Sequence, residues 1–489
     1  MTERRHTDLG ELARRAMEEE GLAADFPAEV LREADAAAGS ESAAAALARA
    51  RDMRGLLWSS IDNDTSRDLD QLEYAEALPG GAARLLVAIA DVDAFVPEAS
   101  ATDRHARLNT VSVYTPAVVF HLLPPALSTD ATSLLEGRDR LALVVELVVD
   151  GDGKVSGREV YPALVRNRAK LVYEEVGAWL AGGATVPPSV ARVEGLEEQV
   201  RLQAGVARAL RALRREHGAL ELETIEAEPV IEDGRVVDLR IKTRTPAQDI
   251  IEAFMVAANT SMAEFLEERG VPSLRRVVRR PERWPRLRQL ARNFGERLPG
   301  SPDSRALSSF LARRKRAAPE DYAELSLAVM KLMGAGDYLV EAPGLEQEGH
   351  FGLAVGDYTH STAPNRRYPD LVTQRCLKAA ASGSPAPYTV EELEEIAEHC
   401  NERESAARKV ERRTHKAAVA MLLAGRAGET FDAAVTGVKG RGTFVRLLMP
   451  PAEGKLVEGE EGLDVGDRLR VRLLSADPER GFIDFARVS

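Results

Sequence analysis

The sequence contains few cysteines, only Cys376 and Cys400 among 489 residues, and neither belongs to a Cys-x-x-Cys pair. Two cysteines cannot build a disulfide framework, and the neighbours His399 and Cys400 lack the spacing of zinc ligands. The composition therefore excludes a small disulfide-stapled domain and argues against a structural zinc site.

Long hydrophobic runs are also missing. The apolar stretch Leu141–Val149 is already interrupted by Glu146, and no run approaches the roughly 18 residues that a membrane-spanning helix requires. The first residues, Met1–Asp8, are polar and charged and lack the apolar core of a secretory signal. We therefore expect a cytoplasmic protein with no membrane partner.

The chain has no excess of positive charge: it contains 65 Lys and Arg residues and 78 Asp and Glu residues, and its net charge is −13. This balance argues against a protein that coats nucleic acid without specificity. It does not exclude an enzyme of nucleic acids, because net charge is global and binding is local. The chain is 44% hydrophobic and 29% charged, an ordinary globular mixture whose length suggests about two to four domains.

Residues 1–50 predict a small helical region. Apolar residues recur at helical spacing from Leu9 to Ala16, Phe26-Pro27 interrupts the pattern, and a second helix begins near Val30. The pattern is compatible with a helix-turn-helix and equally with a plain helical hairpin. Ser40–Ser42 reads as a linker to the next region.

Residues 51–425 mix strand and helix signals and predict one α+β domain. Arg84–Asp91 reads as a buried strand ending in an acid, and Leu141–Val149 reads as a second strand followed by a turn at residues 150–153. Two capping boxes open long helices, Thr245 with Gln248 and Thr389 with Glu392. A further hairpin is expected at Asp233-Gly234.

Residues 428–489 change character. Phe431–Val488 contains short β-rich runs that glycines punctuate at strand-like spacing. This pattern predicts a five-stranded barrel of the OB type, with an unrelated small sandwich as the alternative.

The segment Ile61–Leu72 carries the strongest chemical signal. It reads IDNDTSRDLDQL and contains four aspartates within nine residues: Asp62, Asp64, Asp68 and Asp70. Converging carboxylates repel one another unless a cation neutralises them, and hard oxygen ligands in that number suit Mg²⁺ or Mn²⁺. A solvated acidic turn is the alternative interpretation of the same residues.

At this point the sequence resembles the catalytic RNB domain of the ribonuclease II and ribonuclease R family. The motifs in register are IDNDTSRDLDQ, VAIADV, SVYTP, DRLALV, KLVYEEV, DIIEAFMVAAN, HFGLA and YTHSTAPNRRYPDL, from Ile61 to Leu371. The resemblance implies an α+β catalytic core with a C-terminal OB-fold barrel that binds RNA. It also implies a hydrolase that degrades RNA from the 3′ end to nucleoside 5′-monophosphates.

The resemblance assigns roles to eight residues. It places Mg²⁺, or Mn²⁺, on Asp62, Asp68 and Asp70, and it adds Arg366 as the catalytic residue that stabilises the developing charge on the phosphate. The residues expected to contact RNA are Tyr114, Tyr173, Glu252 and Arg367. A salt bridge to Asp370 is the structural alternative for Arg367.

Two departures from the family pattern leave alternatives open. Family members carry a fourth aspartate where this chain has Gln71, so a catalytically weakened RNA-binding protein is one alternative. A phosphodiesterase acting on DNA is another. The aromatic that opposes Tyr114 in the family falls near Leu222 here, which predicts a half-open clamp on the terminal base.

Single-stranded RNA is the expected partner, together with RNA that has a single-stranded 3′ overhang, and no obligate protein partner is evident. Basic residues gather in three stretches, around Arg279, around Arg313 and along Arg408–Lys416. Together they are expected to follow the phosphate backbone, although each alone is compatible with an ordinary solvated helix face.

Overall fold

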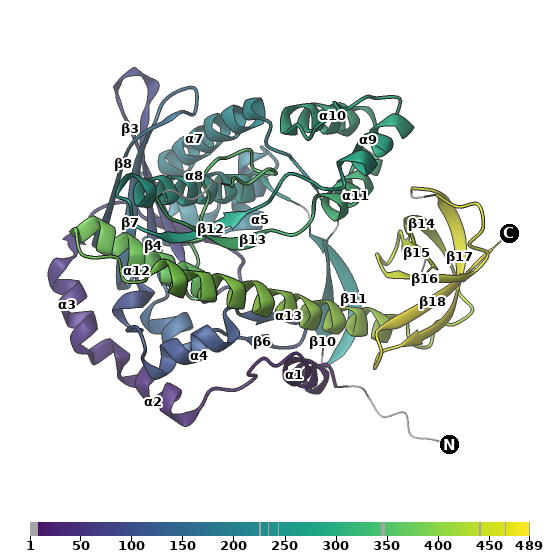
Figure 1. Ribbon diagram of the computed structural model, residues 1–489, viewed down its shortest axis with the longest axis horizontal. Helices are drawn as coiled ribbons and strands as arrows, with labels where there is room; N and C mark the ends of the chain where they lie inside the picture. Colours follow the sequence, from purple (N-terminus) through teal and green to yellow (C-terminus); the bar gives the residue numbers. More distant parts are fainter. Residues whose placement is uncertain are drawn as a thin grey trace.

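The computed structural model describes residues 8–223, 226–232, 234–242, 244–343, 348–439, 442–464 and 466–488. A larger part of mixed helix and sheet lies at one side of the molecule and a small β-barrel at the other, and the long helix α13 (Val390–Leu423) runs from the first to the second (Figure 1). The expected α+β architecture with a terminal barrel is therefore confirmed.

A seven-stranded sheet forms the centre of the larger part, in the order β1-β8-β7-β4-β3-β2-β9. Its strands are β1 (Arg51–Asp52), β2 (Ser59–Asp62), β3 (Gln71–Ala77), β4 (Ala83–Ala90), β7 (Asp139–Val149), β8 (Val155–Arg166) and β9 (Ala169–Val172). Neighbours are antiparallel except at the two margins, where β1 pairs with β8 and β2 with β9 in parallel.

The central strands form where the sequence is most apolar. In β4, seven of the eight residues are buried, because both faces of the sheet are covered, and such strands carry continuous apolar runs. The turn between β7 and β8 lies where the sequence predicts it, with the Gly153 amide donating to the Asp150 carbonyl at 3.0 Å.

Three helices pack together on one side of this sheet: α5 (Tyr173–Leu180), α7 (Leu196–His217) and α8 (Pro246–Glu268). Helix α7 also completes the hydrogen bonding of β3. The side-chain amide of Gln199 donates to the Ala75 carbonyl and accepts from the Ala75 amide, both at 2.7 Å. Strand β2 pairs with β3 only at Ser59 and Glu73, so the glutamine supplies the bonds that the short strand does not reach.

Both predicted capping boxes are present. The Thr245 amide donates to Gln248 at 2.8 Å at the start of α8, and the Thr389 amide donates to Glu392 at 2.8 Å at the start of α13. Helix α12 (Tyr368–Ser382) precedes α13 and ends at Gly383, which adopts the left-handed conformation common after helices.

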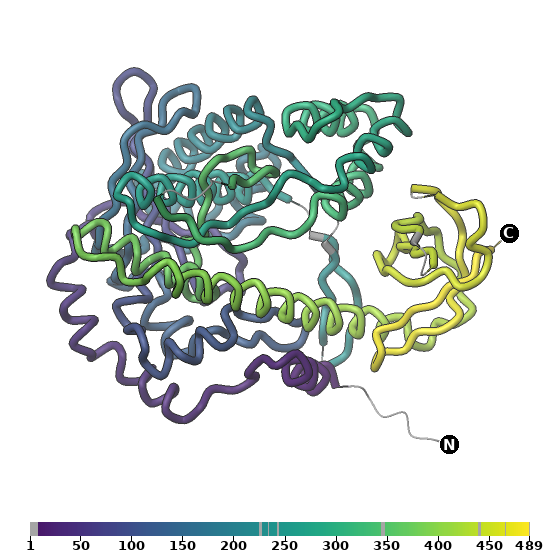
Figure 2. The backbone as a smooth tube through the Cα atoms, in the orientation of Figure 1, coloured from purple at the N-terminus to yellow at the C-terminus, as the bar shows by residue number. Residues whose placement is uncertain are grey.

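The N-terminal region is helical, as expected, but its helices do not pack as one hairpin. Helix α1 (Leu9–Glu19) lies against α13, α2 (Ala28–Ala36) against α4 (Ala101–Asn109), and α3 (Glu41–Arg49) against β8. Figure 2 shows this segment running along the lower margin of the larger part. The expected linker at Ser40–Ser42 is wrong, because the Ser40 side chain accepts from the Ala43 amide and caps α3.

Smaller elements complete the larger part. They are the strand pairs β5 (Val113–Tyr114) with β6 (Val119–Phe120), β10 (Glu226–Glu232) with β11 (Arg235–Lys242) and β12 (Ser273–Val277) with β13 (Asp337–Glu341), and the helices α6 (Pro188–Ala191), α9 (Trp284–Asn293), α10 (Ser304–Ala317) and α11 (Tyr322–Met333). Strands β10 and β11 pair antiparallel where the second hairpin is expected, although Asp233 of that turn lies outside the described residues.

The C-terminal barrel is closed in the order β14-β15-β16-β18-β17, which confirms the predicted barrel over the sandwich. Its strands are β14 (Thr430–Lys439), β15 (Gly442–Leu447), β16 (Glu453–Glu458), β17 (Arg468–Asp477) and β18 (Phe482–Arg487). Its core includes Val419, Ala420 and Leu423 of α13, so the barrel packs on the end of that helix. Within the described ranges, no helix has the length and apolar character needed to cross a membrane.

Candidate active site

The acidic loop between β2 and β3 is held at one end of the central sheet. Asp62 is the last residue of β2 and Asp70 immediately precedes β3, and the antiparallel pairing of the two strands brings both to the same end. The Lys170 Nζ donates to the carbonyls of Asp64 and Ser66 at 2.6 and 2.7 Å, which fixes the path of the loop. Asp62 and Asp70 therefore lie at the same end of the strand pair.

Asp62 is oriented by its own loop. One carboxylate oxygen accepts from the Asn63 amide at 2.8 Å and from the Ser66 hydroxyl at 2.6 Å. Burial raises the pKa of Asp62, and the nearby charge of Asp68 adds to that rise, whereas the hydrogen bonds oppose it. A nearby cation would stabilise the ionised form of a carboxylate in this setting.

Asp70 is the most buried of the three expected ligands, with a side chain 3% exposed. It accepts from the Asn365 amide at 3.0 Å and faces the Arg366 Nε at 3.3 Å. Burial raises the pKa of Asp70 to about 7, and the Arg366 charge opposes that shift. The loop after residue 360 thus meets the acidic loop at this carboxylate.

Asp68 faces the residue expected to bind the terminal base. The Tyr114 hydroxyl lies 3.5 Å from an Asp68 oxygen, and the Tyr114 amide donates to Glu411 of α13 at 3.0 Å. Tyr114 is 43% exposed on the short β5–β6 pair. An exposed ring beside the acidic loop can stack on a base while the loop acts on the adjoining phosphate.

The two adjacent arginines have different environments. Arg366 is 44% exposed and turns its Nε toward Asp70. Arg367 is largely buried and donates to Asp370 at 2.7 Å, and the same Asp370 oxygen accepts from the Ala363 amide at 2.8 Å. Arg367 therefore makes the salt bridge that was its structural alternative, and it stabilises the loop that presents Arg366.

The remaining expected RNA contacts lie on two helices. Tyr173 begins α5 directly after Val172, which pairs with Asp62, and burial together with the Asp62 charge raises its pKa. Glu252 of α8 forms ion pairs with Arg244 and, at 3.5 Å, with Arg214. The structure thus places Tyr173 beside the acidic loop, whereas Glu252 is already engaged by arginines.

Leu222, expected to oppose Tyr114, lines a cavity of about 180 Å³ together with Glu252, Arg214 and Arg244. Tyr114 is not among the residues that line this cavity. The half-open clamp stays a prediction.

The first and third basic stretches are only partly available to RNA. Arg275 and Arg276 are buried in β12 and paired with Glu341 and Glu404. On α13, Lys409 pairs with Glu20 of α1 at 2.9 Å. These contacts stabilise the fold, because each basic side chain is held by an acidic residue distant in sequence.

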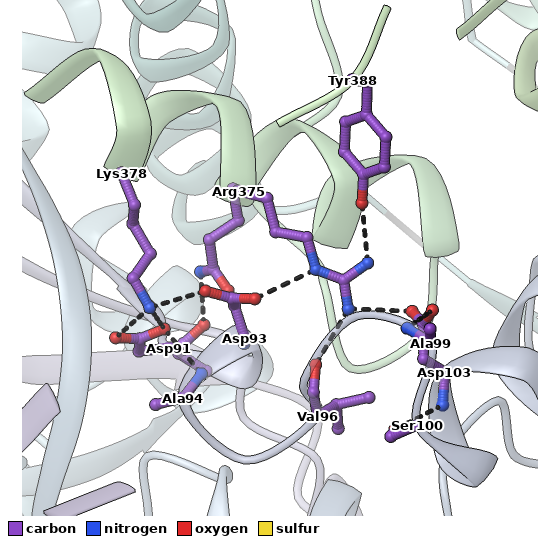
Figure 3. Close-up of polar contacts among 12 residues, drawn as sticks. Asp91, Asp93, Ala94, Val96, Ala99, Ser100, Asp103, Arg375, Lys378 and Tyr388 are labelled. Carbon is purple, nitrogen blue, oxygen red and sulfur yellow. Dashed lines mark hydrogen bonds and ion pairs between the residues drawn. The ribbon is translucent and has the colours of Figure 1, made fainter. Parts of the chain in front are cut away.

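A buried ion-pair network, drawn in Figure 3, joins helix α12 to the segment that follows β4. The Lys378 Nζ lies 2.9 Å from Asp91 and 2.8 Å from Asp93, and Arg375 contacts Asp93 at 3.0 Å and Asp103 at 2.8 Å. Lysine and arginine belong to α12, whose N-terminus follows directly after Arg366-Arg367. The sequence shows that a buried strand ends at Asp91, but it does not show that Lys378, almost three hundred residues later, pairs with this acid.

The donor set of the acidic loop suits a divalent cation, since it consists of carboxylate oxygens. In the part of the chain that the structure describes, however, one group of three acidic side chains has oxygens all within 4.8 Å, and it is Glu267, Glu341 and Asp357 rather than the loop aspartates. The loop aspartates are instead turned to separate partners, as mutually repelling carboxylates are expected to be.

Comparison with known proteins adds independent information. The family model described as the RNB domain matches residues 50–383, and that of the RNase II-type exonuclease C-terminal S1 domain matches residues 429–488. The chain is 32% identical to ribonuclease R of Thermotoga maritima and 30% identical to ribonuclease R of Aquifex aeolicus. Each match covers 95% of this chain and 68% of the relative.

Among solved structures, Mycoplasma genitalium RNase R in complex with ribose methylated single-stranded RNA has the same fold, with a TM-score of 0.87 and 23% identity. The superposition covers 98% of this chain and 78% of that one.

Proposed function

Because the chain belongs to the RNB family of 3′-to-5′ exoribonucleases, we propose that it uses a divalent cation, Mg²⁺ in the first place, to hydrolyse single-stranded RNA to nucleoside 5′-monophosphates. The observation that carries the proposal is the meeting of Arg366 with the buried Asp70 at 3.3 Å, at the same end of the sheet as Asp62. That arrangement places carboxylates that can bind a metal ion next to an arginine side chain that can bind phosphate.

The acidic residues have the first role. Asp62, Asp68 and Asp70 would hold the cation at the scissile phosphate. When bound there, it polarises the phosphate and lowers the pKa of an attacking water. Asp62 and Asp70 each accept a hydrogen bond from a backbone amide, and both carboxylates would turn from their present partners toward a shared cation.

Arg366 has the second role. Its guanidinium is charged at every accessible pH, and its planar donors match the oxygens of a phosphate. With Nε turned to Asp70 and almost half of the side chain exposed, the group can stabilise charge that develops on the phosphate during cleavage.

The RNA is positioned by aromatic and polar residues around the acidic loop. Tyr114 would stack on the 3′-terminal base, and Tyr173 and Glu252 would contact the sugars. An acid that accepts from a 2′-hydroxyl distinguishes RNA from DNA. The related RNase R structure with single-stranded RNA supports this class of substrate.

A time course on 5′-labelled RNA, with and without Mg²⁺, tests polarity and metal dependence together. We expect progressive shortening from the 3′ end and release of mononucleotides only with the cation. A matched DNA oligomer is the control for the phosphodiesterase alternative. Tight RNA binding without cleavage at any Mg²⁺ or Mn²⁺ concentration would instead favour the weakened RNA-binding protein that Gln71 suggests.

A further inference from the structure

Basic side chains gather around one cavity beside Glu252, at the C-terminal end of α7. The cavity has a volume of about 180 Å³, and the bases that line it are Arg211, Arg214, Arg215, Arg244 and Lys315. The carboxylates that face these bases are Glu221, Glu223 and Glu252 in the lining and Asp249, which pairs with Arg211 and Arg244. Four acids therefore meet five bases, and the cavity has a surplus of one positive charge.

Arg214 is the most buried of these five bases, with a side chain 16% exposed. Its ion pair is with Glu252, at 3.5 Å. Among the described residues, the Arg214 Nε has no hydrogen-bond partner, and it is shielded from solvent. Burial lowers the pKa of Arg214, and the charge of Glu252 opposes that shift. A buried guanidinium in this state is stabilised by an anion that offers it several oxygens.

The acids of the cavity are already engaged by other bases. Arg211 donates to Glu221 at 3.1 Å. Glu252 is shared between two arginines, because one of its oxygens pairs with Arg244 and the other faces Arg214. Glu252 therefore compensates Arg214 only in part, and a further anion can bind beside it.

Direct contacts connect this cavity to the acidic loop. Arg244 immediately precedes Thr245, whose hydroxyl donates to the Tyr173 carbonyl at 3.4 Å. Tyr173 in turn follows Val172, which pairs with Asp62. Because the Arg244 side chain is 43% exposed, the cavity can be reached from solvent on this side.

We propose that Arg214 and Arg244 bind one backbone phosphate of the RNA, and that this contact releases Glu252 from its ion pairs to accept from the adjacent 2′-hydroxyl. A backbone phosphate carries one negative charge, which equals the surplus of the cavity, and its oxygens suit two planar guanidinium groups. The inference rests on the proposed function, because it concerns the same RNA and the sugar contact assigned to Glu252. RNA satisfies the arginines and Glu252 together, whereas DNA offers the phosphate without the hydroxyl.

The experiment measures the affinity for short single-stranded RNA oligomers in EDTA by fluorescence anisotropy. In each oligomer a different backbone phosphate is replaced by an uncharged methylphosphonate. Wild type should lose affinity by about tenfold at the linkage that enters the cavity, since hydrogen bonds to a charged group are lost. In Arg214→Met the same replacement should cost less than about threefold, because the contact is already absent. At every other linkage the variant should respond like wild type.

Two further variants keep the result unambiguous. Arg244→Met changes an exposed side chain, so the protein should fold, and it should lose the response at the same linkage as Arg214→Met. Arg208→Met is the matched control, since Arg208 is exposed on the same helix and does not line the cavity. The slope of log affinity against log salt should become shallower by about 0.7 in Arg214→Met and stay at the wild-type value in Arg208→Met.

The release of Glu252 has a readout of its own. In wild type, a 2′-deoxy nucleotide beside the responsive linkage should weaken binding. It should have no effect once that linkage is a methylphosphonate, because Glu252 then stays paired with Arg244 and Arg214. An equal cost of the 2′-deoxy nucleotide in both oligomers overturns the release of Glu252.

A folded Arg214→Met or Arg244→Met that responds like wild type at every linkage, beside a wild type that cleaves RNA with Mg²⁺, overturns the phosphate site alone and leaves the arginines as partners of Glu252. A wild type that neither binds nor cleaves RNA overturns the proposed function, and the inference with it.

Discussion

The Nε of Arg366 lies 3.3 Å from an oxygen of Asp70, so that a half-exposed cation meets a carboxylate that is 3% exposed. The contact joins two loops almost three hundred residues apart and defines where the chemistry is expected. Because the Asn365 amide holds the other Asp70 oxygen at 3.0 Å, the orientation of the carboxylate is fixed from two sides.

Asp70→Asn is expected to abolish cleavage while RNA binding is retained. The amide keeps the shape of the side chain and can still accept from Asn365, but it removes the negative charge that a cation requires. Single-turnover cleavage with saturating Mg²⁺ should fall by about 100-fold or more, whereas RNA affinity from filter binding should change by less than about threefold. Near wild-type cleavage would show that Asp70 is not a ligand.

Asp64→Asn is the matched control for that variant. Asp64 belongs to the same loop, but its side chain is exposed, and the bond from Lys170 at 2.6 Å is accepted by its backbone carbonyl. Its cleavage rate should stay close to that of wild type, which would show that the loss in Asp70→Asn does not come from loop charge in general.

Arg366→Lys should lower the catalytic rate far more than the affinity for RNA. Lysine keeps the charge but loses the planar pair of donors that matches a phosphate, so the loss falls on the transition state. We expect a decrease of about 100-fold in single-turnover rate with nearly unchanged RNA affinity. Equal losses in rate and affinity would make Arg366 a docking residue.

Tyr114→Ala should weaken RNA binding, and Tyr114→Phe should not. Stacking of one base on an aromatic ring contributes about 1–3 kcal/mol, which corresponds to a loss of roughly 5- to 150-fold in affinity when the ring is removed. Tyr114→Phe keeps the ring and removes the hydroxyl that lies 3.5 Å from Asp68. If Tyr114→Phe loses as much affinity as Tyr114→Ala, the hydroxyl rather than the ring carries the interaction.

Lys378→Met should destabilise the protein by about 3 kcal/mol or more, because it leaves the buried Asp91 without its partner at 2.9 Å. Denaturant unfolding measures the effect. Lys409→Met is the matched control. Lys409 is 52% exposed and pairs with Glu20 at the surface, so its removal should cost no more than about 1 kcal/mol. Similar losses in both variants would show that the network of Figure 3 contributes little.

Local patterns predicted much of this fold. The apolar run of β4, the turn at residues 150–153 and the capping boxes at Thr245 and Thr389 all depend on neighbours within a few residues. The placing of Asp62 and Asp70 at one end of the sheet is equally local, since it requires only one turn between two adjacent strands. These features are short-range, and sequence spacing describes short-range geometry.

The features that sequence reasoning missed depend on distant partners. We interpreted Ser40 as part of a linker because, in sequence alone, a serine that caps a helix looks the same as a serine in a loop; in the structure Ser40 caps α3. The arginines of β12 read as surface charge because Glu341 and Glu404, which bury and pair them, lie in other elements. Glu73 has no role in the sequence analysis, and its burial without a hydrogen-bond partner among the described residues follows only from the folded structure.

His350 provides a test of pH dependence outside the acidic loop. Its Nδ1 accepts from the Leu353 amide at 3.1 Å, its ring packs edge-on against Tyr358, and burial lowers its pKa from 6.5 to about 4. In the unfolded chain the ordinary pKa returns, so between pH 6.5 and pH 4 the unfolded state binds a proton that the folded state does not. His350 therefore makes the protein lose stability as the pH falls through that window, by about 1–2 kcal/mol at pH 5.

His350→Asn should remove this contribution, because the asparagine oxygen can still accept from Leu353 but does not titrate. The free energy of unfolding, measured for both proteins at pH 7.5 and pH 5, should fall less in the variant than in wild type. His360 is present in both proteins, and burial lowers its pKa well below the ordinary value in each; the charge of His350 is a smaller cause of the same shift. Equal losses between the two pH values would mean that His350 takes up its proton in the folded state as easily as in the unfolded chain, which its packing against Tyr358 argues against.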